Sequence, residues 1–206
     1  MAITNYSDLK TTVANYLART DLTAQIPDFI QLAEVRLRRD LRIRQMLRSV
    51  QTIMTGGDAT VSLPSDFLEL RDLFINTNPI RDLQYLTPSL LSRNGRGTES
   101  GLPVFYSIIG ADFKFAPVPD SNYTLEMLYY SAPTLLSDLN TSNTFLANAP
   151  DLLLYGSLIE AEPYLMNDAR IQLWAGMYDR GLSALNSSDD RSESSGVPLT
   201  MTLSAR

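Results

Sequence analysis

Hydrophobic residues recur at helical spacing near the start of the chain. Ser7 is placed to cap a helix that carries Leu9, Val13, Tyr16 and Leu17 on one side. The segment Thr20-Asp21-Leu22-Thr23 interrupts this pattern. Pro27 then stands in the first turn of a longer helix, where its missing N–H costs nothing. The apolar stripe of this second helix consists of Ile26, Ile30, Ala33, Leu37 and Leu41.

After Arg48 the period changes from that of a helix to that of a strand. Residues 50–54 and 59–63 each alternate between apolar and polar side chains, and the turn residues 56–58 separate them. This arrangement predicts a β-hairpin. Further strands are predicted at 68–75, 104–109, 112–116 and 123–130, a short helix at 86–91 and a polar loop at 92–101.

Helical spacing returns in the last third of the chain. One helix opens at Pro150 and is expected to end near Met166. A second helix, capped by Asn167 or Asp168, is expected to end near Leu185 and carries Ile171, Trp174, Tyr178 and Leu182 on one face. Residues 187–206 are rich in serine and contain Pro198, which predicts an extended tail that becomes ordered on a partner.

The order of these elements predicts an α+β fold. The N- and C-terminal helix pairs are expected to form a bundle, with an antiparallel β lobe inserted between them and an extended C-terminal tail. The predicted division is 1–48 for the N-terminal helices, 49–135 for the β-rich lobe, 136–186 for a connector and the C-terminal helices, and 187–206 for the tail.

The composition excludes several classes of enzyme. The chain has no cysteine and no histidine, which removes thiol nucleophiles, Ser-His-Asp triads and the commonest zinc ligands. Gly95 and Gly97 are not followed by the Lys-Ser/Thr pair of a phosphate-binding loop, and Leu128 stands where a metal-dependent nuclease would carry lysine. We therefore expect no enzyme activity, no cofactor and no metal site. The neighbouring acids are expected to be solvated surface residues, and they are Asp66 with Glu69, Glu160 with Glu162, and Asp189 with Asp190.

The N-terminus lacks the basic and apolar regions of a signal peptide, and no apolar run approaches the roughly 20 residues that a membrane span requires. The formal net charge is −6, but it is unevenly distributed. Residues 1–50 contain eight basic and five acidic side chains, whereas residues 120–193 contain three basic and eleven acidic ones. Such asymmetry suits a protein that docks against other charged subunits.

Six arginines gather around the end of the second helix. The guanidinium fork matches carboxylates and phosphates, and the chain prefers arginine to lysine throughout. A solvated helix face is one interpretation. We favour a contact with another subunit, in which the arginines meet the acidic C-terminal third of a neighbour. The six are Arg36, Arg38, Arg39, Arg42, Arg44 and Arg48.

Aromatic residues gather in the predicted β lobe. Aromatic rings can stack nucleic-acid bases on a sheet, but few basic residues accompany these rings, so we expect a hydrophobic core or an assembly interface. The residues are Phe105, Tyr106, Phe113, Phe115, Tyr123, Tyr129 and Tyr130.

Several segments resemble the head-to-tail adaptor, or connector, proteins of short-tailed phages. The segments are residues 22–34, 63–70, 149–156 and 168–178, and the likeness extends over about residues 3–186. These segments contain packing and turn residues without catalytic groups. The tail beyond residue 187 is poorly covered.

The resemblance implies a structural virion protein. Such adaptors form a twelvefold ring under the portal, extend the DNA channel and present a platform to the tail tube or nozzle. DNA passes through on ejection without sequence-specific binding, no membrane is involved, and the protein is expected at the head–tail junction after assembly in the host cytoplasm. In relatives a C-terminal extension embraces the portal, so Val197, Pro198, Leu199, Met201 and Leu203 are candidate contacts here.

The resemblance also implies that some acidic residues of the C-terminal third face the channel and repel DNA. Three alternatives remain open at this point. They are a head-completion or stopper protein of a long-tailed phage, a virion enzyme that acts through carboxylates, and a small regulatory binding module.

Overall fold

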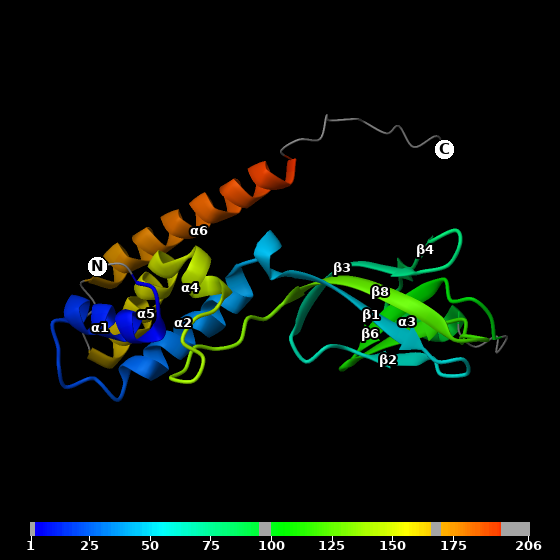
Figure 1. The fold of residues 1–206 in the computed structure, drawn as a ribbon, viewed down its shortest axis with the longest axis horizontal. Helices are drawn as coiled ribbons and strands as arrows, with labels where there is room; N and C mark the ends of the chain where they lie inside the picture. The colour runs from blue at the N-terminus through cyan, green and yellow to red at the C-terminus, as the bar shows by residue number, and fades with distance from the viewer. Residues whose placement is uncertain (1–2, 95–99, 166–169, 195–206) are drawn as a thin grey trace. The chain divides into compact units, whose positions relative to one another are not determined.

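The computed structural model describes residues 3–94, 100–165 and 170–194 (Figure 1). Contacts within the chain divide it into two units. One unit is helical and combines Met1–Gln45 with Pro133–Arg206, and the other is the β unit, Met46–Ala132. Helices at both ends of the chain and largely antiparallel sheets in its middle confirm the predicted α+β fold.

The helical unit is organised around a central helix. Its helices are α1 (Tyr6–Leu17), α2 (Ile26–Asp40), α4 (Thr144–Asn148), α5 (Pro150–Leu165) and α6 (Ile171–Ser194). α1, α2, α4 and α6 all contact α5. α5 buries side chains around most of its circumference, as expected of a helix enclosed by others. The stripe predicted for α2 is buried from Ile26 to Leu41.

The N-terminal cap of α1 differs from the prediction. Asn5, and not Ser7, precedes the helix in an extended conformation, and its Oδ1 accepts a hydrogen bond of 2.9 Å from the backbone N–H of Asp8. Ser7 lies inside the first turn. Asparagine and serine cap helices about equally well, so residue type alone does not decide between neighbouring candidates.

The C-terminal helix α6 is longer than predicted. It continues to Ser194, so the expectation of an extended tail is wrong for residues 187–194. The hydroxyl of Ser187 donates to the carbonyl of Ala184 at 3.0 Å and that of Ser192 to Asp189 at 2.8 Å, which places both serines within the helix without unpaired hydroxyls. The predicted boundary at Met166, the cap candidates Asn167 and Asp168, and residues 195–206 lie outside the described residues.

The β unit contains two four-stranded sheets. The first has the order β1-β8-β3-β4 and the second β2-β7-β6-β5. All neighbouring strands are antiparallel except β5 and β6. The strands are β1 (Leu47–Met54), β2 (Thr60–Ser62), β3 (Phe67–Ile75), β4 (Arg81–Asp82), β5 (Gln84–Tyr85), β6 (Phe105–Ile109), β7 (Asp112–Ala116) and β8 (Tyr123–Ser131).

The predicted hairpin over residues 50–63 is wrong. Both of its strands exist, but β1 pairs with β8 and β2 pairs with β7. The turn between them packs against another loop, because Gly57 donates its N–H to the carbonyl of Pro119 at 2.7 Å. A Cβ atom at Gly56 would lie 2.9 Å from the Cα of Ser121, so only glycine fits this close approach.

The short helix α3 (Pro88–Asn94) lies slightly later in the chain than predicted and includes the start of the expected polar loop. Residues 95–99 of that loop lie outside the described residues.

The core of the β unit contains the predicted aromatic cluster in part. Phe113, Phe115 and Tyr129 are buried together with Met54 and Met127. Tyr106 and Tyr123 pack against them and are half-buried. For the buried rings a structural role explains the aromatic cluster without nucleic-acid stacking.

Candidate assembly interface

Arg36 links three helices of the helical unit. It projects from α2, and its Nε donates to Glu160 Oε1 on α5 at 2.9 Å, while its Nη2 pairs with the same oxygen. The guanidinium carbon also lies 5.9 Å from the centre of the Tyr178 ring on α6. Arg36 therefore stabilises the packing of helices within one chain, because its charge is already paired with an acid of that chain.

Arg38 and Arg42 both donate hydrogen bonds to backbone carbonyls. Arg38 donates through Nη2 to the carbonyl of Pro133. Arg42 donates through Nη1 to the carbonyls of Arg38 and Leu41 at 2.8 and 2.7 Å. The last carbonyls of a helix lack intrahelical partners and carry the negative end of its dipole, so cations are favourable there. Arg42 therefore stabilises the end of α2, whereas Arg38 joins α2 to the connector at Pro133.

The other arginines differ in exposure. Asp189 of α6 accepts the backbone N–H of Arg44 at 3.1 and 3.3 Å, and its Oδ1 lies 3.8 Å from Arg44 Nε. Arg48, on β1, lies 3.3 Å from Asp66 and its side chain is 64% exposed. Arg39 is exposed and makes no hydrogen bond or ion pair with the described part of the chain.

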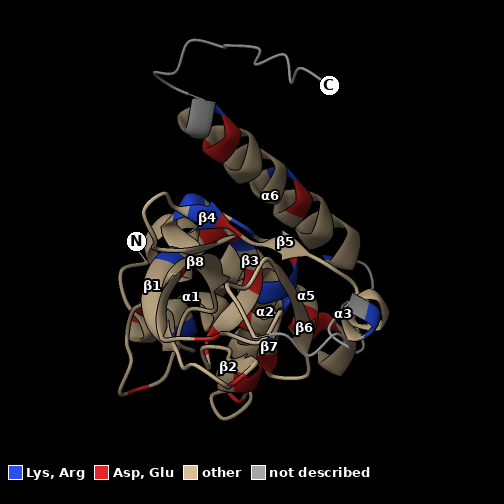
Figure 2. Cartoon of the chain, turned by 90° about the vertical axis from the view of Figure 1, so that its right-hand side faces the viewer, with Lys and Arg blue, Asp and Glu red and all other residues tan. Residues whose placement is uncertain are grey.

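Two acids that pair with these arginines come from the same chain and not from a neighbour. Glu160 and Asp189 both belong to the acidic C-terminal third, and α6 carries charges of both signs along its length (Figure 2). A contact of the arginines with another subunit stays a prediction. Arg39 is the member best placed for it, since its charge is exposed and uncommitted within the described residues.

The sequence predicts that the neighbouring acids are solvated surface residues. In the structure, not all of them are. Glu162 is fully buried on α5, accepts a hydrogen bond of 3.2 Å from Trp174 Nε1 and lies 3.3 Å from Arg170 Nε. Asp66 accepts a hydrogen bond of 2.9 Å from the hydroxyl of Tyr129. The interpretation as free surface acids is therefore wrong for Glu162. It is incomplete for Asp66, and also for Glu160 and Asp189, which pair with Arg36 and Arg44.

Glu34 has a structural role that the sequence pattern did not predict. It is 1% exposed on α2, and both of its carboxylate oxygens accept the backbone N–H of Leu136 at 3.1 Å. Asn143 also donates its side-chain amide to Oε1 at 2.6 Å. Glu34 thus holds the connector before α4 against α2. Its position between Ala33 and Leu37, beside the apolar stripe, is the feature of the sequence from which its burial could have been predicted.

Burial raises the pKa of Glu34, while the hydrogen bonds from Leu136 and Asn143 oppose this change. Because the folded-state pKa is raised, the stability that protonated Glu34 contributes is present below the unfolded pKa and is lost as the pH rises through the folded pKa. Glu34→Gln keeps an oxygen acceptor and cannot ionise. We expect the wild type to gain stability relative to this variant as the pH falls from 7 toward 4, measured by urea unfolding. A difference that does not change with pH would contradict this assignment.

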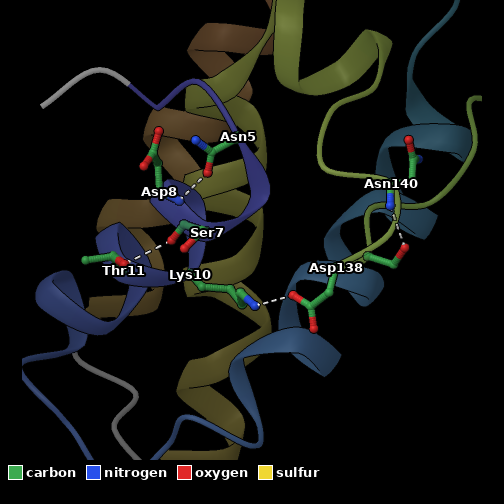
Figure 3. Close-up of polar contacts among 8 residues, drawn as sticks. Asn5, Ser7, Asp8, Lys10, Thr11, Asp138 and Asn140 are labelled. Atoms are coloured by element: carbon green, nitrogen blue, oxygen red, sulfur yellow. Dashed lines mark hydrogen bonds and ion pairs between the residues drawn. The ribbon is translucent and has the colours of Figure 1, made fainter.

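A pocket of about 660 Å³ lies beside α1 and the start of α2. Lys10, which lines it, is paired with Asp138 at 2.7 Å (Figure 3), and Arg19 is paired with Asp21 at 2.6 Å. Both basic groups of the lining are therefore already neutralised. The remaining lining is small and polar or apolar, and comprises Ser7, Thr11, Ala14, Asn15, Ala18, Thr20, Thr23, Ile26 and Pro27.

The arrangement offers packing surfaces more than reactive groups. Among the described residues no group of three or more acidic side chains is placed to hold a metal ion. None of the helices in the described ranges is both long and apolar enough to cross a membrane.

Comparison with known proteins places the chain in a family. A family model described as SU10 adaptor protein matches residues 4–202, which is nearly the whole chain. No match was found among curated proteins. The match confirms the resemblance to phage adaptors found in the sequence. The chain therefore belongs to the SU10 adaptor protein family, a family of phage adaptor proteins.

Proposed function

We propose that the chain forms a ring between the portal and the tail tube or nozzle of a phage particle, where it extends the DNA channel. The observation that carries this proposal is the family match over residues 4–202. Adaptor proteins of this kind are structural and act through contacts with other virion proteins. By the same reasoning we propose that the chain has no catalytic activity of its own.

An exposed face of α2 supports a lateral contact between subunits. Leu32 and Val35 are 49% and 38% exposed, and Arg39 follows them on the same side of the helix. A ring interface is heterologous, so one face of a subunit meets a different face of its neighbour. Arg39 would meet an acidic residue of that neighbour, with Asp179 on the exposed side of α6 as one candidate.

The charge distribution supports a role beside DNA. The C-terminal third is strongly acidic, and negative charge along a channel wall keeps the phosphate backbone from adhering. We therefore propose that some exposed acids of this third face the channel.

Assembly is expected to depend on the portal. A single lateral contact is weak, but subunits held side by side on a portal ring gain from the closure of the whole ring. On this view the free chain is monomeric, and the portal templates a ring of about twelve copies.

Co-sedimentation with an isolated portal ring tests this proposal. The full-length chain should move with the ring, whereas an unrelated acidic protein of similar mass, as the control, should stay behind. If the chain remains in the slow fraction at concentrations of tens of micromolar, the portal contact is wrong.

A further inference from the structure

Strand β1 has an open edge. It pairs along its whole length with β8, from Leu47 opposite Tyr130 to Met54 opposite Tyr123. It is the terminal strand of its sheet, and its other edge has no backbone partner among the described residues (Figure 1). The other terminal strands, β2, β4 and β5, have at most three residues. β3 is also open where it extends beyond β4, but that stretch is bulged and carries three charged residues, so β1 provides the longest regular open edge.

This edge lacks the devices that usually protect an exposed strand. Proteins discourage edge-to-edge pairing with charged residues, proline, bulges or very short strands. β1 contains Arg48 as its one charged residue, has no proline and runs in regular register with β8. Val50 and Ile53 are 37% and 67% exposed. Such an edge can accept an added strand.

The two faces of β1 define what an added strand must present. Val50 and Thr52 lie opposite the core residues Met127 and Leu125, and Met54 lies opposite Tyr123, which packs against the core. These three residues of β1 therefore share the face that covers the core. Met54 is buried, but Val50 is exposed at the margin of this face. On the other face the side chains of Ser49 and Gln51 bond to Glu126 at 3.1 and 2.8 Å. This second face is polar except at Ile53, so a matching strand is apolar on one face and mainly polar on the other.

The last residues of the chain have this pattern. Val197, Leu199, Met201 and Leu203 alternate with Pro198, Thr200, Thr202 and Ser204, which is the period of a strand with one apolar face. No charged residue interrupts the segment from 196 to 204, and Pro198 precedes the part that would pair. These residues follow the end of α6 at Ser194 and lie outside the described residues.

We propose that residues 199–204 of one copy add as a strand to the open edge of β1 in the neighbouring copy. The apolar side chains Leu199, Met201 and Leu203 would cover Val50 and extend the core face of the sheet. Thr200 and Thr202 would lie on the side of Ser49 and Gln51. This inference rests on the proposed ring, because the ring supplies the neighbour.

Exchange between copies fits the symmetry of a ring. A closed ring built head to tail requires two different, complementary surfaces on every subunit. One donor segment and one acceptor edge per chain meet this requirement, so each copy gives one strand and receives one. Main-chain hydrogen bonds would provide the affinity and the alternating side chains the register.

Engineered cysteines test the proposal, because the natural chain contains none. One variant carries Val50→Cys, and a second set carries one cysteine at each position from 199 to 204. Equal amounts of the two are assembled on the portal ring and oxidised gently. Directly opposed residues of paired strands have Cβ atoms roughly 4.5–5.5 Å apart, close enough for a disulfide after small shifts.

The expected yield of disulfide-linked pairs alternates along the tail. Positions 199, 201 and 203 should link to Val50→Cys several times more strongly than 200, 202 and 204, and Gln51→Cys should reverse the preference. Thr52→Cys repeats the test on the core face if Val50→Cys disturbs the fold. Rings that form without this alternation overturn the strand exchange and leave the proposed function intact.

A single chain can also carry both engineered cysteines. If it forms only an intramolecular disulfide, the segment pairs within one copy, which contradicts exchange. Tails that link to the portal alone would contradict it as well. Failure to form any ring on the portal would overturn both the exchange and the proposed function.

Discussion

Gly156→Leu is expected to lower the free energy of unfolding of the helical unit by about 3 kcal/mol. Gly156 lies on α5 and faces Ala33 of α2. A Cβ atom at this position would lie 3.1 Å from the Cβ of Ala33, which is tighter than ordinary packing, and 3.6 Å from a ring carbon of Tyr178. A leucine would have to push α2 and α6 away from the central helix.

Gly176→Ala on α6 is the matched control. A Cβ atom at Gly176 would meet nothing within 4 Å, so the substitution should stabilise the helix by up to about 1 kcal/mol. Urea unfolding followed by far-ultraviolet circular dichroism measures both variants. Equal stability of Gly156→Leu and the wild type would contradict the close packing of α2 on α5.

Removal of residues 195–206 is expected to leave the fold intact and to weaken assembly on the portal by more than about tenfold. The deleted residues contain the proposed donor strand, and a lost contact recurs at every subunit of a ring. The thermal midpoint of the truncated chain should match that of the full chain, because the described cores of both units lie before residue 195. Titration of the portal ring with each chain measures the change.

A full-length variant separates strand pairing from loss of tail length. Thr200→Pro with Thr202→Pro removes backbone donors from the segment, whereas Thr200→Ser with Thr202→Ser keeps them. The proline pair should weaken assembly as truncation does, and the serine pair should assemble normally. Normal assembly by the truncated chain would show that the tail plays no part.

Local patterns predicted most elements of the fold, because each depends on neighbouring residues. Pro150 marks the start of α5 as its preference for the first helical turn suggests, and the stripe from Ile26 to Leu41 is the buried face of α2. The strands β3, β7 and β8 also lie within a residue of their predicted bounds.

Partners distant in the sequence could not be predicted in this way. Alternation identified β1 and β2 as strands but gave no information about β8 and β7, which pair with them across the sheets. The burial of Glu162 depends on Trp174 and Arg170, which reach it from the next helix segment. The helix α6 ends later than its sequence predicts, because serines usually favour turns and caps. In α6 the serine hydroxyls bond to carbonyls within the helix instead.

The pairing of residues in the candidate interface also depends on partners distant in the sequence. The sequence identified a conspicuous arginine cluster and the acidic C-terminal third as complementary. It could not show that Arg36 meets Glu160 and that Arg44 meets Asp189 within one chain. Reversal of several arginines together would therefore damage the bundle, so tests of a contact between subunits are best directed at Arg39.

Native mass spectrometry shows whether this adaptor assembles as a ring on the portal. The chain has a mass of 22.9 kDa and is measured alone and after mixing with an isolated portal ring. We expect a monomer alone and a portal complex that carries about twelve added copies. A portal ring whose mass does not change in the presence of excess chain would contradict this expectation.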